Sequence, residues 1–310
     1  MSSQSGSRPH VCILMSTFNG EEFLVEQLDS LLNQQGVDVT IIVRDDGSSD
    51  GTRRILERYQ EANRNIQVHP GANLGVVPSF LELMRIAPAS SAGYFALCDQ
   101  DDVWLPEKLS HAVRALESDK STPRLYCSVV RYVDKSLRHL GSSRPGIRPD
   151  FRNAVVENIA TGCTVVFNRA LLQLVNSAAP RRALMHDWWL YLVASAFGDV
   201  VFDRQSWILY RQHGRNVIGG TTSIMRMMVI RIRRMRLRQG GVFRCSDQAE
   251  EFLRCFGERC PPAHRQLLEE MLAVRKSLFR RIRFAFAGKI RRNHWIDDGL
   301  LRLLLIAGHY

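Results

Sequence analysis

A repeated pattern of apolar runs and polar loops constrains the fold of this chain more than any other feature. Four short apolar runs occupy residues 11–15, 39–43, 66–68 and 94–98, each ends in a polar loop, and helical periodicity follows the first three. Alternating strands and helices form right-handed crossovers and a mostly parallel sheet with helices on both faces. Ligands of such sheets bind beyond the carboxyl ends of the strands. The pattern therefore predicts an α/β fold whose polar loops meet at one cleft.

The remainder of the chain is less regular and becomes strongly basic. Strands are predicted at 125–133 and 164–167, and a loop rich in proline, glycine and arginine separates them. A length of 310 residues suits one catalytic domain with an extension. We expect a disordered N-terminus at residues 1–10, a catalytic domain at 11–219 and a basic helical C-terminal region at 220–310.

Composition indicates a globular protein of a reducing compartment. Hydrophobic residues make up 45% and charged residues 24% of the chain. The seven cysteines are scattered and form no C-x-x-C pair, which favours reduced thiols in the cytoplasm. The first ten residues lack the apolar core of a signal peptide, and no run of about 18 apolar residues occurs. We therefore expect a cytoplasmic protein, with a peripheral position on the inner membrane as a further interpretation.

Three aspartates lie directly after the fourth apolar run, as Asp99, Asp101 and Asp102. Crowded carboxylates repel each other, and their burial without a partner is costly. A hard divalent cation such as Mg²⁺ or Mn²⁺ resolves the conflict, because it takes oxygen ligands and keeps places for phosphate oxygens. The alternative is that one aspartate caps a helix that starts near residues 105–107. The cluster predicts a metal site.

A second acidic loop contains Asp45 and Asp46, followed by Gly47 and Ser48. One interpretation is a plain Asp-Gly turn. The other is a nucleotide contact, because a carboxylate at a strand end can accept a hydrogen bond from a base or a ribose hydroxyl. The glycine-rich loops of the chain match neither G-x-G-x-x-G nor a Walker A pattern, which argues against a dehydrogenase or a P-loop enzyme.

Asp187 stands among large aromatic residues, where desolvation raises a carboxyl pKa and favours action as a general base. The alternative is an N-cap of the helix predicted at 188–196. Further along the chain, Arg211 and His213 are candidates to neutralise a diphosphate or to complete a metal shell.

Eight motifs together resemble the family 2 glycosyltransferases of the GT-A fold, and in particular their bacterial rhamnosyltransferase-like branch. Their order and spacing cover about residues 11–219, and no motif follows residue 220. The motifs are Ser16-Thr17-Phe18-Asn19-Gly20, Glu26-Gln27-Leu28-Asp29-Ser30, Arg44-Asp45-Asp46-Gly47-Ser48-Ser49-Asp50, Asn73-Leu74-Gly75, Asp99-Gln100-Asp101-Asp102, Thr161-Gly162-Cys163-Thr164, His186-Asp187-Trp188-Trp189 and Tyr210-Arg211-Gln212-His213-Gly214.

The resemblance implies a GT-A, Rossmann-like fold and a role for each motif. It makes Asp187 the catalytic base, and many relatives have Glu-Asp where this chain has His186 before Asp187. The donor site that it implies contains Thr17, Asn19, Asp45, Asp46, Asn73, Gly75, Asp99, Gln100 and Arg211. The metal ligands that it implies are Asp99, Asp101, Asp102 and His213, and the acceptor-side residues are Gly162, Cys163, Thr164, His186 and Trp188.

The resemblance also implies a reaction, which is a single displacement with inversion that uses Mn²⁺ or Mg²⁺. The favoured donor is dTDP-rhamnose, followed by a UDP- or dTDP-hexose. The expected acceptor is a hydroxyl of a glycan or of a lipid-linked oligosaccharide, as in the synthesis of bacterial cell-surface polysaccharides.

Two basic stretches carry the net charge of +11, and they lie at residues 204–246 and 271–296. Within the first, the spacing predicts a partly amphipathic helix at residues 224–238, which would lie on an anionic membrane or pack on the catalytic domain. A nucleic-acid-binding protein is the rival class, but the chain shows no aromatic-interleaved motif and no known module, so no nucleic acid is expected. Another metal-dependent, nucleotide-using transferase is the second alternative.

Overall fold

The fold is built on a seven-stranded sheet with the strand order β10-β6-β9-β4-β1-β2-β3. The computed structural model describes residues 8–89, 91–143, 148–213 and 244–310. Strand β9 runs antiparallel to both of its neighbours, and the other pairs of adjacent strands are parallel. The strands of this sheet are β1 (His10–Thr17), β2 (Asp38–Asp45), β3 (Ile66–Pro70), β4 (Tyr94–Cys98), β6 (Arg124–Ser128), β9 (Val166–Asn168) and β10 (Asp199–Asp203).

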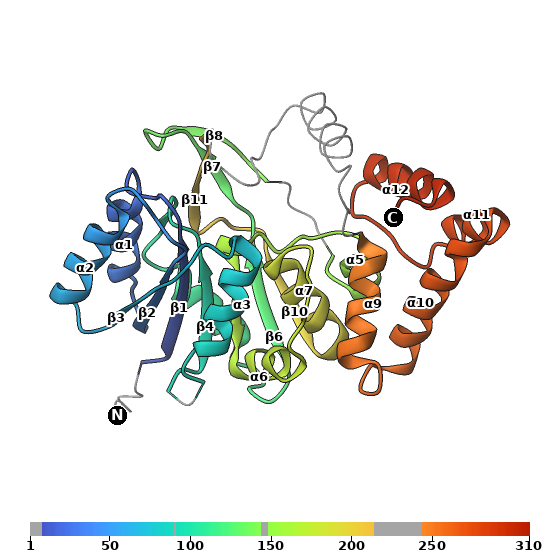
Figure 1. The fold of residues 1–310 in the computed structure, drawn as a ribbon, viewed down its shortest axis with the longest axis horizontal. Helices are drawn as coiled ribbons and strands as arrows, with labels where there is room; N and C mark the ends of the chain where they lie inside the picture. Colours follow the sequence, from blue (N-terminus) through green and yellow to red (C-terminus); the bar gives the residue numbers. More distant parts are fainter. Residues whose placement is uncertain (1–7, 90, 144–147, 214–243) are drawn as a thin grey trace, which may run out of the picture.

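Helices cover both faces of this sheet (Figure 1). The alternation of side chains along β1 sets the two layers, because Cys12 and Leu14 face one hydrophobic cluster while Val11, Ile13 and Met15 face the other. The first cluster includes residues of α3 (Val76–Ile86), α5 (Phe151–Ala154), α6 (Arg169–Ala178) and α7 (His186–Phe197). The second includes residues of α1 (Leu24–Leu32), α2 (Thr52–Ala62) and α4 (Lys108–Leu116). The predicted α/β class with helices on both faces is confirmed.

A second sheet of four strands brings a late part of the chain back to the acidic loop. Its order is β5-β11-β7-β8, where β5 is Val103–Trp104, β7 is Arg131–Val133, β8 is His139–Ser142 and β11 is Ile208–Arg211. Strand β11 pairs with β5, which directly follows the aspartate cluster. This pairing explains why residues 211–213 meet residues 101–102 although more than a hundred positions separate them.

Residues 244–310 form four α-helices, which are α9 (Cys245–Phe256), α10 (Pro262–Ala273), α11 (Leu278–Phe286) and α12 (Trp295–Ala307). They lie together at one end of the molecule, opposite α1 and α2 (Figure 1). Phe252 of α9 packs 6.1 Å from the Trp189 ring and 6.0 Å from the Phe197 ring of α7. The helical C-terminal region therefore shares its hydrophobic core with the catalytic sheet.

None of the helices in the described ranges combines the length and the apolar character that crossing a bilayer requires. The helix predicted at residues 224–238 lies outside the described part of the chain.

Several predicted boundaries need correction. Strand β1 begins at His10, inside the segment predicted to be disordered, of which residues 1–7 lie outside the described ranges. The strand predicted at 125–133 is two strands in different sheets. The N–H of Val129 donates to the carbonyl oxygen of Asp203, whereas the N–H of Val130 donates to the hydroxyl of Ser143, so the two strands do not continue one ladder. The strand predicted at 164–167 begins as a 3₁₀ turn and becomes β9 only at residue 166.

Candidate active site

A cavity of about 1000 Å³ opens at the carboxyl ends of the parallel strands, where the polar loops were expected to meet. Its walls come from the loops after β1, β2, β3 and β4, from the first turn of α7 and from the end of β11. The predicted site residues that line it are Asn19, Asp46, Asn73, Gly75, Asp99, Gln100, Asp101, Gly162, His186, Asp187 and His213.

The other predicted site residues stand behind this surface. Trp188, for example, turns away from the cavity, and its indole nitrogen donates to the carbonyl oxygen of Ala154 at 2.6 Å. The residues that do not line the cavity are Thr17, Asp45, Asp102, Cys163, Thr164, Trp188 and Arg211. Any role of these seven acts through the loops that they hold.

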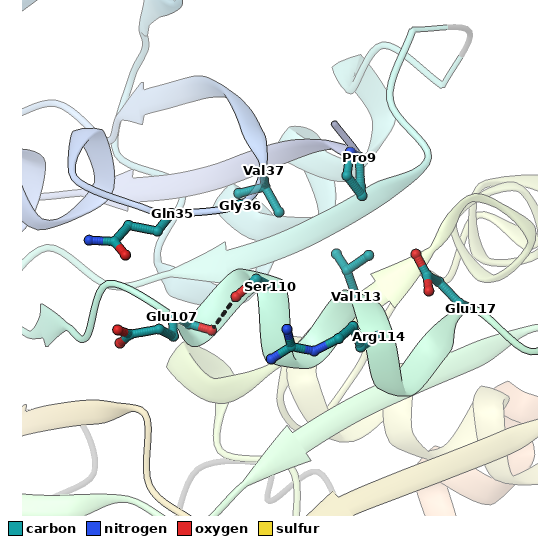
Figure 2. A pocket seen from close by; sticks show the side chains of 9 residues that line it. All are labelled: Pro9, Gln35, Gly36, Val37, Glu107, Ser110, Val113, Arg114 and Glu117. Carbon is teal, nitrogen blue, oxygen red and sulfur yellow. Dashed lines mark hydrogen bonds between the residues drawn. The ribbon is translucent and has the colours of Figure 1, made fainter. Parts of the chain in front are cut away.

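A smaller cavity of about 320 Å³ lies at the opposite edge of the sheet, near the beginning of β1 and β2 (Figure 2). Its lining includes Pro9, Gly36, Glu107 and Arg114, and none of the predicted site residues. Parallel sheets bind ligands at the carboxyl ends of their strands, so the larger cavity is the candidate site.

Hydrogen bonds fasten the first loop to its two neighbours. The backbone N–H of Phe18 donates to Oε1 of Gln100 at 2.8 Å, and Nε2 of Gln100 donates back to the Phe18 carbonyl at 3.1 Å. Asn19 has a φ of +49°, a conformation that asparagine tolerates. Its N–H donates to Ser48, and its side-chain oxygen accepts from the N–H of Ser49. The three loops therefore form one connected rim.

The two aspartates of the second acidic loop have different surroundings. Asp45 is fully buried and accepts from the N–H of Ser48 at 3.2 Å and from Nε of Arg53 at 2.9 Å. Asp46 lies at the cavity and accepts from the N–H groups of Leu74 and Gly75, both at 2.8 Å. The turn interpretation therefore fits Asp45, while Asp46 anchors the loop after β3 and remains on the cavity surface.

The aspartate cluster divides in a similar way. Oδ2 of Asp101 lies 2.7 Å from Nε2 of His213, and both residues line the cavity. Asp99 also faces the cavity, and burial together with the charges of Asp101 and Asp187 raises its pKa to about 7. The N-cap of α4 is Glu107, so the alternative that one of the three aspartates caps this helix is wrong.

Asp102 lies in the protein interior and accepts a hydrogen bond from the backbone N–H of Arg211 at 3.0 Å. Its carboxylate, that of Asp99 and the Cys163 sulfur lie within 4.8 Å of one another. Burial and the two carboxylates raise the pKa of the Cys163 thiol well above its usual value, which keeps it protonated. A hard cation that enters from the cavity therefore meets Asp101 and His213 before this buried group.

Arg211 holds the acidic loop from behind. Its Nε donates to the carbonyl oxygen of Asp101 at 2.9 Å, and its guanidinium pairs with Glu26 and lies 4.4 Å over the Phe23 ring. The side chain is buried and does not reach the cavity surface. Its charge is thus engaged by Glu26, and its direct contribution is to fix the position of Asp101.

Asp187 lies in the first turn of α7 and faces the cavity. Burial raises its pKa to about 6, although hydrogen bonds from Trp188, Asn158 and Gly162 act in the opposite direction. The N-cap of α7 is Met185, so the alternative that Asp187 caps this helix is wrong. A carboxylate with this pKa can accept a proton near neutral pH.

His186 is buried next to Asp187 and stacks on Phe80 with a ring separation of 3.9 Å. Burial lowers its pKa to about 3, so the ring is neutral at physiological pH. Neither ring nitrogen has a hydrogen-bond partner among the described residues. The ring can hydrogen-bond to a ligand in the cavity, but it does not compete with Asp187 for a proton.

The sequence analysis did not single out Asn158, which belongs to this site, or Lys108, which lies buried behind it. Asn158 donates a hydrogen bond to Asp187 and lines the cavity, and it stands in an irregular stretch without a motif. Lys108 is buried with its Nζ 3.2 Å from the centre of the Trp104 ring, and burial lowers its pKa to about 8. The spacing of four between Lys108, Ala112 and Leu116 could have shown that this lysine stands on the apolar face of its helix.

The fold and the site together define a nucleotide-sugar-dependent transferase of the GT-A type, and comparison with known proteins identifies the family. The sequence model described as "Glycosyl transferase family 2" matches residues 12–175, more than half of the chain. The protein belongs to this family and is a glycosyltransferase.

Individual relatives agree with this assignment. The chain is 30% identical to the dTDP-rhamnosyl transferase RfbG of Shigella flexneri over 221 residues, which are 67% of this chain and 75% of RfbG. Its fold is similar to that of S. aureus TarS 1–349 in complex with UDP-GlcNAc, with a TM-score of 0.56, 17% identity and coverage of 97% and 89% of the two chains. The mannosyltransferase PcManGT of Pyrobaculum calidifontis, in complex with GDP-Man and Mn²⁺, has a TM-score of 0.50, 18% identity and coverage of 98% and 81%.

The rim of the cavity provides a first test. A Cβ atom at Gly20 would lie 2.2 Å from Oε1 of Gln100, so Gly20→Ala must displace the side chain that binds the Phe18 backbone. We expect Gly20→Ala and Gln100→Ala each to lower the free energy of unfolding by about 1–3 kcal/mol, the value of two lost hydrogen bonds. The free energy of unfolding of the double variant should equal that of the less stable single variant, because the two substitutions remove the same contacts. Urea denaturation measures this, and additive losses would contradict the proposed linkage.

Proposed function

We propose that this protein transfers rhamnose from dTDP-rhamnose to a hydroxyl of a glycan or of a lipid-linked oligosaccharide, with inversion at the anomeric carbon. The observation that carries the proposal is the position of Asp187, a buried carboxylate that faces the same cavity as Asp101 and His213. A base on one side of a cavity and a cation site on another suit a single displacement. The similarity to RfbG supports rhamnose and dTDP.

A divalent cation, Mn²⁺ or Mg²⁺, fits the residues that face the cavity. Asp101 and His213 converge from two separate segments with their ligand atoms 2.7 Å apart, and Asp99 faces the same cavity, where burial and the charges of Asp101 and Asp187 raise its pKa to about 7. Oxygen and imidazole ligands suit Mn²⁺, and hard cations keep places for phosphate oxygens. When bound, the ion would offset the charge on the leaving diphosphate.

The protein's own side chains then divide the remaining work. Asp187 takes the proton of the acceptor hydroxyl, and the neutral ring of His186 is placed to hydrogen-bond a hydroxyl next to it. On the donor side, Asp46 and Asn73 line the cavity beside the backbone of Gly75. The residues behind the wall, including Arg211 and Asp45, keep these groups in position.

We further propose that the protein acts at the cytoplasmic face of the inner membrane, where a lipid-linked acceptor would be available. The rival interpretation as a nucleic-acid-binding protein has no support in the site, since the cavity is lined by carboxylates, which repel a polyanion.

A panel of nucleotide sugars tests the donor. A ligand that binds only the folded state raises the melting temperature as its occupancy grows. In the presence of Mn²⁺ we expect dTDP-rhamnose to raise it by several degrees, more than dTDP-glucose, UDP-glucose, UDP-GlcNAc or GDP-mannose at the same concentration. A larger shift with one of the other nucleotide sugars would identify that compound as the donor instead of dTDP-rhamnose. No shift with any nucleotide sugar of the panel would contradict nucleotide-sugar binding.

The variant Asp187→Asn tests the base. It should release dTDP from dTDP-rhamnose in the presence of acceptor about 10²–10⁴-fold more slowly than the wild type, the usual contribution of a general base. The thermal shift with the donor should be unchanged, because the amide has the size of the carboxyl group. Asp199→Asn changes an exposed aspartate of β10 and serves as the control. A near wild-type rate for Asp187→Asn would contradict the assignment of Asp187 as the general base.

The pH dependence provides an independent test of the same group. Burial raises the pKa of Asp187 from 3.8 to about 6, so its ionised form dominates above that pH and is lost below it. We expect kcat/KM to fall about tenfold per pH unit well below pH 6 and to level off above pH 7. The residual activity of Asp187→Asn should lack this limb, and a wild-type profile that is flat from pH 5 to pH 8 would exclude Asp187 as the titrating base.

A further inference from the structure

Helices α11 and α12 carry large apolar side chains that no described part of the chain covers. Phe279 and Phe286 of α11 are 75% and 68% exposed, and Trp295 at the start of α12 is 80% exposed. Single exposed apolar residues are ordinary, whereas groups of them mark sites of interaction. These three aromatic side chains are the most exposed large apolar residues in the described ranges, and they belong to two helices that pack together.

The exposed side chains of α11 share one face of the helix. Residues 279, 282 and 286 follow one another at spacings of three and four, and Ile282 is exposed as well. The other side of the helix buries Phe284 and Ala285 against the protein. This helix therefore has one apolar face for the core and a second one that points outward.

Helix α12 has the same construction. Leu301 and Leu305 are buried, while Leu303 is exposed on the opposite side and Trp295 is exposed in the first turn. Both helices lie at the end of the molecule that is farthest from α1 and α2 (Figure 1).

Basic side chains accompany the apolar ones. Residues 277–310 contain seven arginine and lysine residues and only two acidic residues. Arg280 and Arg283 are exposed beside the aromatic stripe of α11, and neither forms an ion pair with a residue that the structure describes. Three other basic residues of this part are engaged, in the pairs Lys289–Glu270, Arg291–Asp150 and Arg302–Asp298.

We propose that the outward faces of α11 and α12 bind the surface of an anionic membrane. Phe279, Phe286 and Trp295 enter the boundary between headgroups and acyl chains, and Arg280 and Arg283 lie at the level of the lipid phosphates. Aromatic residues prefer this boundary, and each basic residue near an anionic leaflet adds to the attraction.

A second copy of the chain suits this surface less well. In a symmetric dimer both copies present the same surface, so the two unpaired arginines that flank the stripe would lie near those of the other copy, and like charges across an interface repel each other. An anionic lipid surface supplies the phosphate groups that these arginines lack, so charge complementarity favours the membrane.

This proposal deepens the proposed action on a lipid-linked acceptor, since it names the surface that would hold the enzyme beside such an acceptor. Binding to membranes is measured in an assay that does not require sugar transfer. Transfer from dTDP-rhamnose to a water-soluble acceptor is measured in an assay that contains no membranes. The two proposals can therefore fail separately.

Vesicle co-sedimentation tests the surface. The full-length wild-type protein should bind vesicles of phosphatidylcholine with 30% phosphatidylglycerol at least tenfold more tightly than vesicles of phosphatidylcholine alone, and 0.5 M salt should weaken this binding. The variant Phe279→Ser/Phe286→Ser/Trp295→Ser should lose at least tenfold in affinity for the anionic vesicles. Leu140→Ser, which changes an exposed apolar residue of β8, is the matched control and should bind like the wild type.

A fluorescence experiment locates the contact. Lipids with brominated acyl chains should quench Trp295 on binding, and Trp295→Phe should keep vesicle affinity within about threefold while losing this quenching. Circular dichroism should give the same melting temperature for the wild type and the triple variant, because the three side chains are exposed.

Three results would overturn the proposal. They are the absence of wild-type binding to anionic vesicles, equal binding to neutral vesicles, and unchanged binding by the triple variant. A wild-type dimer that the triple substitution dissociates, without vesicle binding, would assign the surface to self-association instead.

Discussion

Repulsion among carboxylates at the carboxyl edge of the sheet sets the conditions for the whole site. Asp99 and Asp101 follow β4, while Asp187 comes from the first turn of α7, and the fold brings all three to one cavity. Burial, together with the charges of Asp101 and Asp187, raises the pKa of Asp99 to about 7. Arg211 hydrogen-bonds to the backbone of the acidic loop, but it lies behind the cavity wall and pairs with Glu26. We propose that a divalent cation from solution compensates the charge, and Asp101 and His213 are the residues that would receive it.

The rest of the site serves to keep these charges in place. Adjacent residues of one motif often have different tasks, because successive side chains at the end of a strand point to opposite sides. Asp46 faces the cavity and Asp45 holds its loop, and in the next motif Asp101 faces the cavity while Asp102 accepts from Arg211. Rigid support of this kind is what a displacement reaction requires, since small misplacements of the reacting groups are costly.

The sequence was sufficient for the sheet and for the convergence of its loops, because short apolar runs followed by polar loops are local signals. Its motif also led to Asp187, which lines the cavity, while the role of Asp187 as the base stays a prediction. The sequence was insufficient wherever a distant partner decides the outcome. The single strand expected at 125–133 is divided, because β10 pairs with its first part and β11 with its last part. Both partner strands lie some seventy residues later in the chain. The orientation of Arg211 depends on Glu26, and the burial of Lys108 on the packing of α4. The exposure of the outward aromatic residues of α11 could not be predicted from the sequence, because the spacing of apolar residues does not say which of two apolar faces is buried.

Binding of Mn²⁺ to the purified protein, measured by the electron paramagnetic resonance signal of the free ion, tests the central claim most directly. The account predicts one saturable site per chain. It also predicts that Asp101→Asn and His213→Gln weaken this site at least tenfold, while Asp119→Asn, at an exposed aspartate outside the cavity, leaves it unchanged. The absence of saturable binding, or equal affinity in Asp101→Asn and the wild type, would contradict the proposal that these carboxylates are gathered to hold a cation.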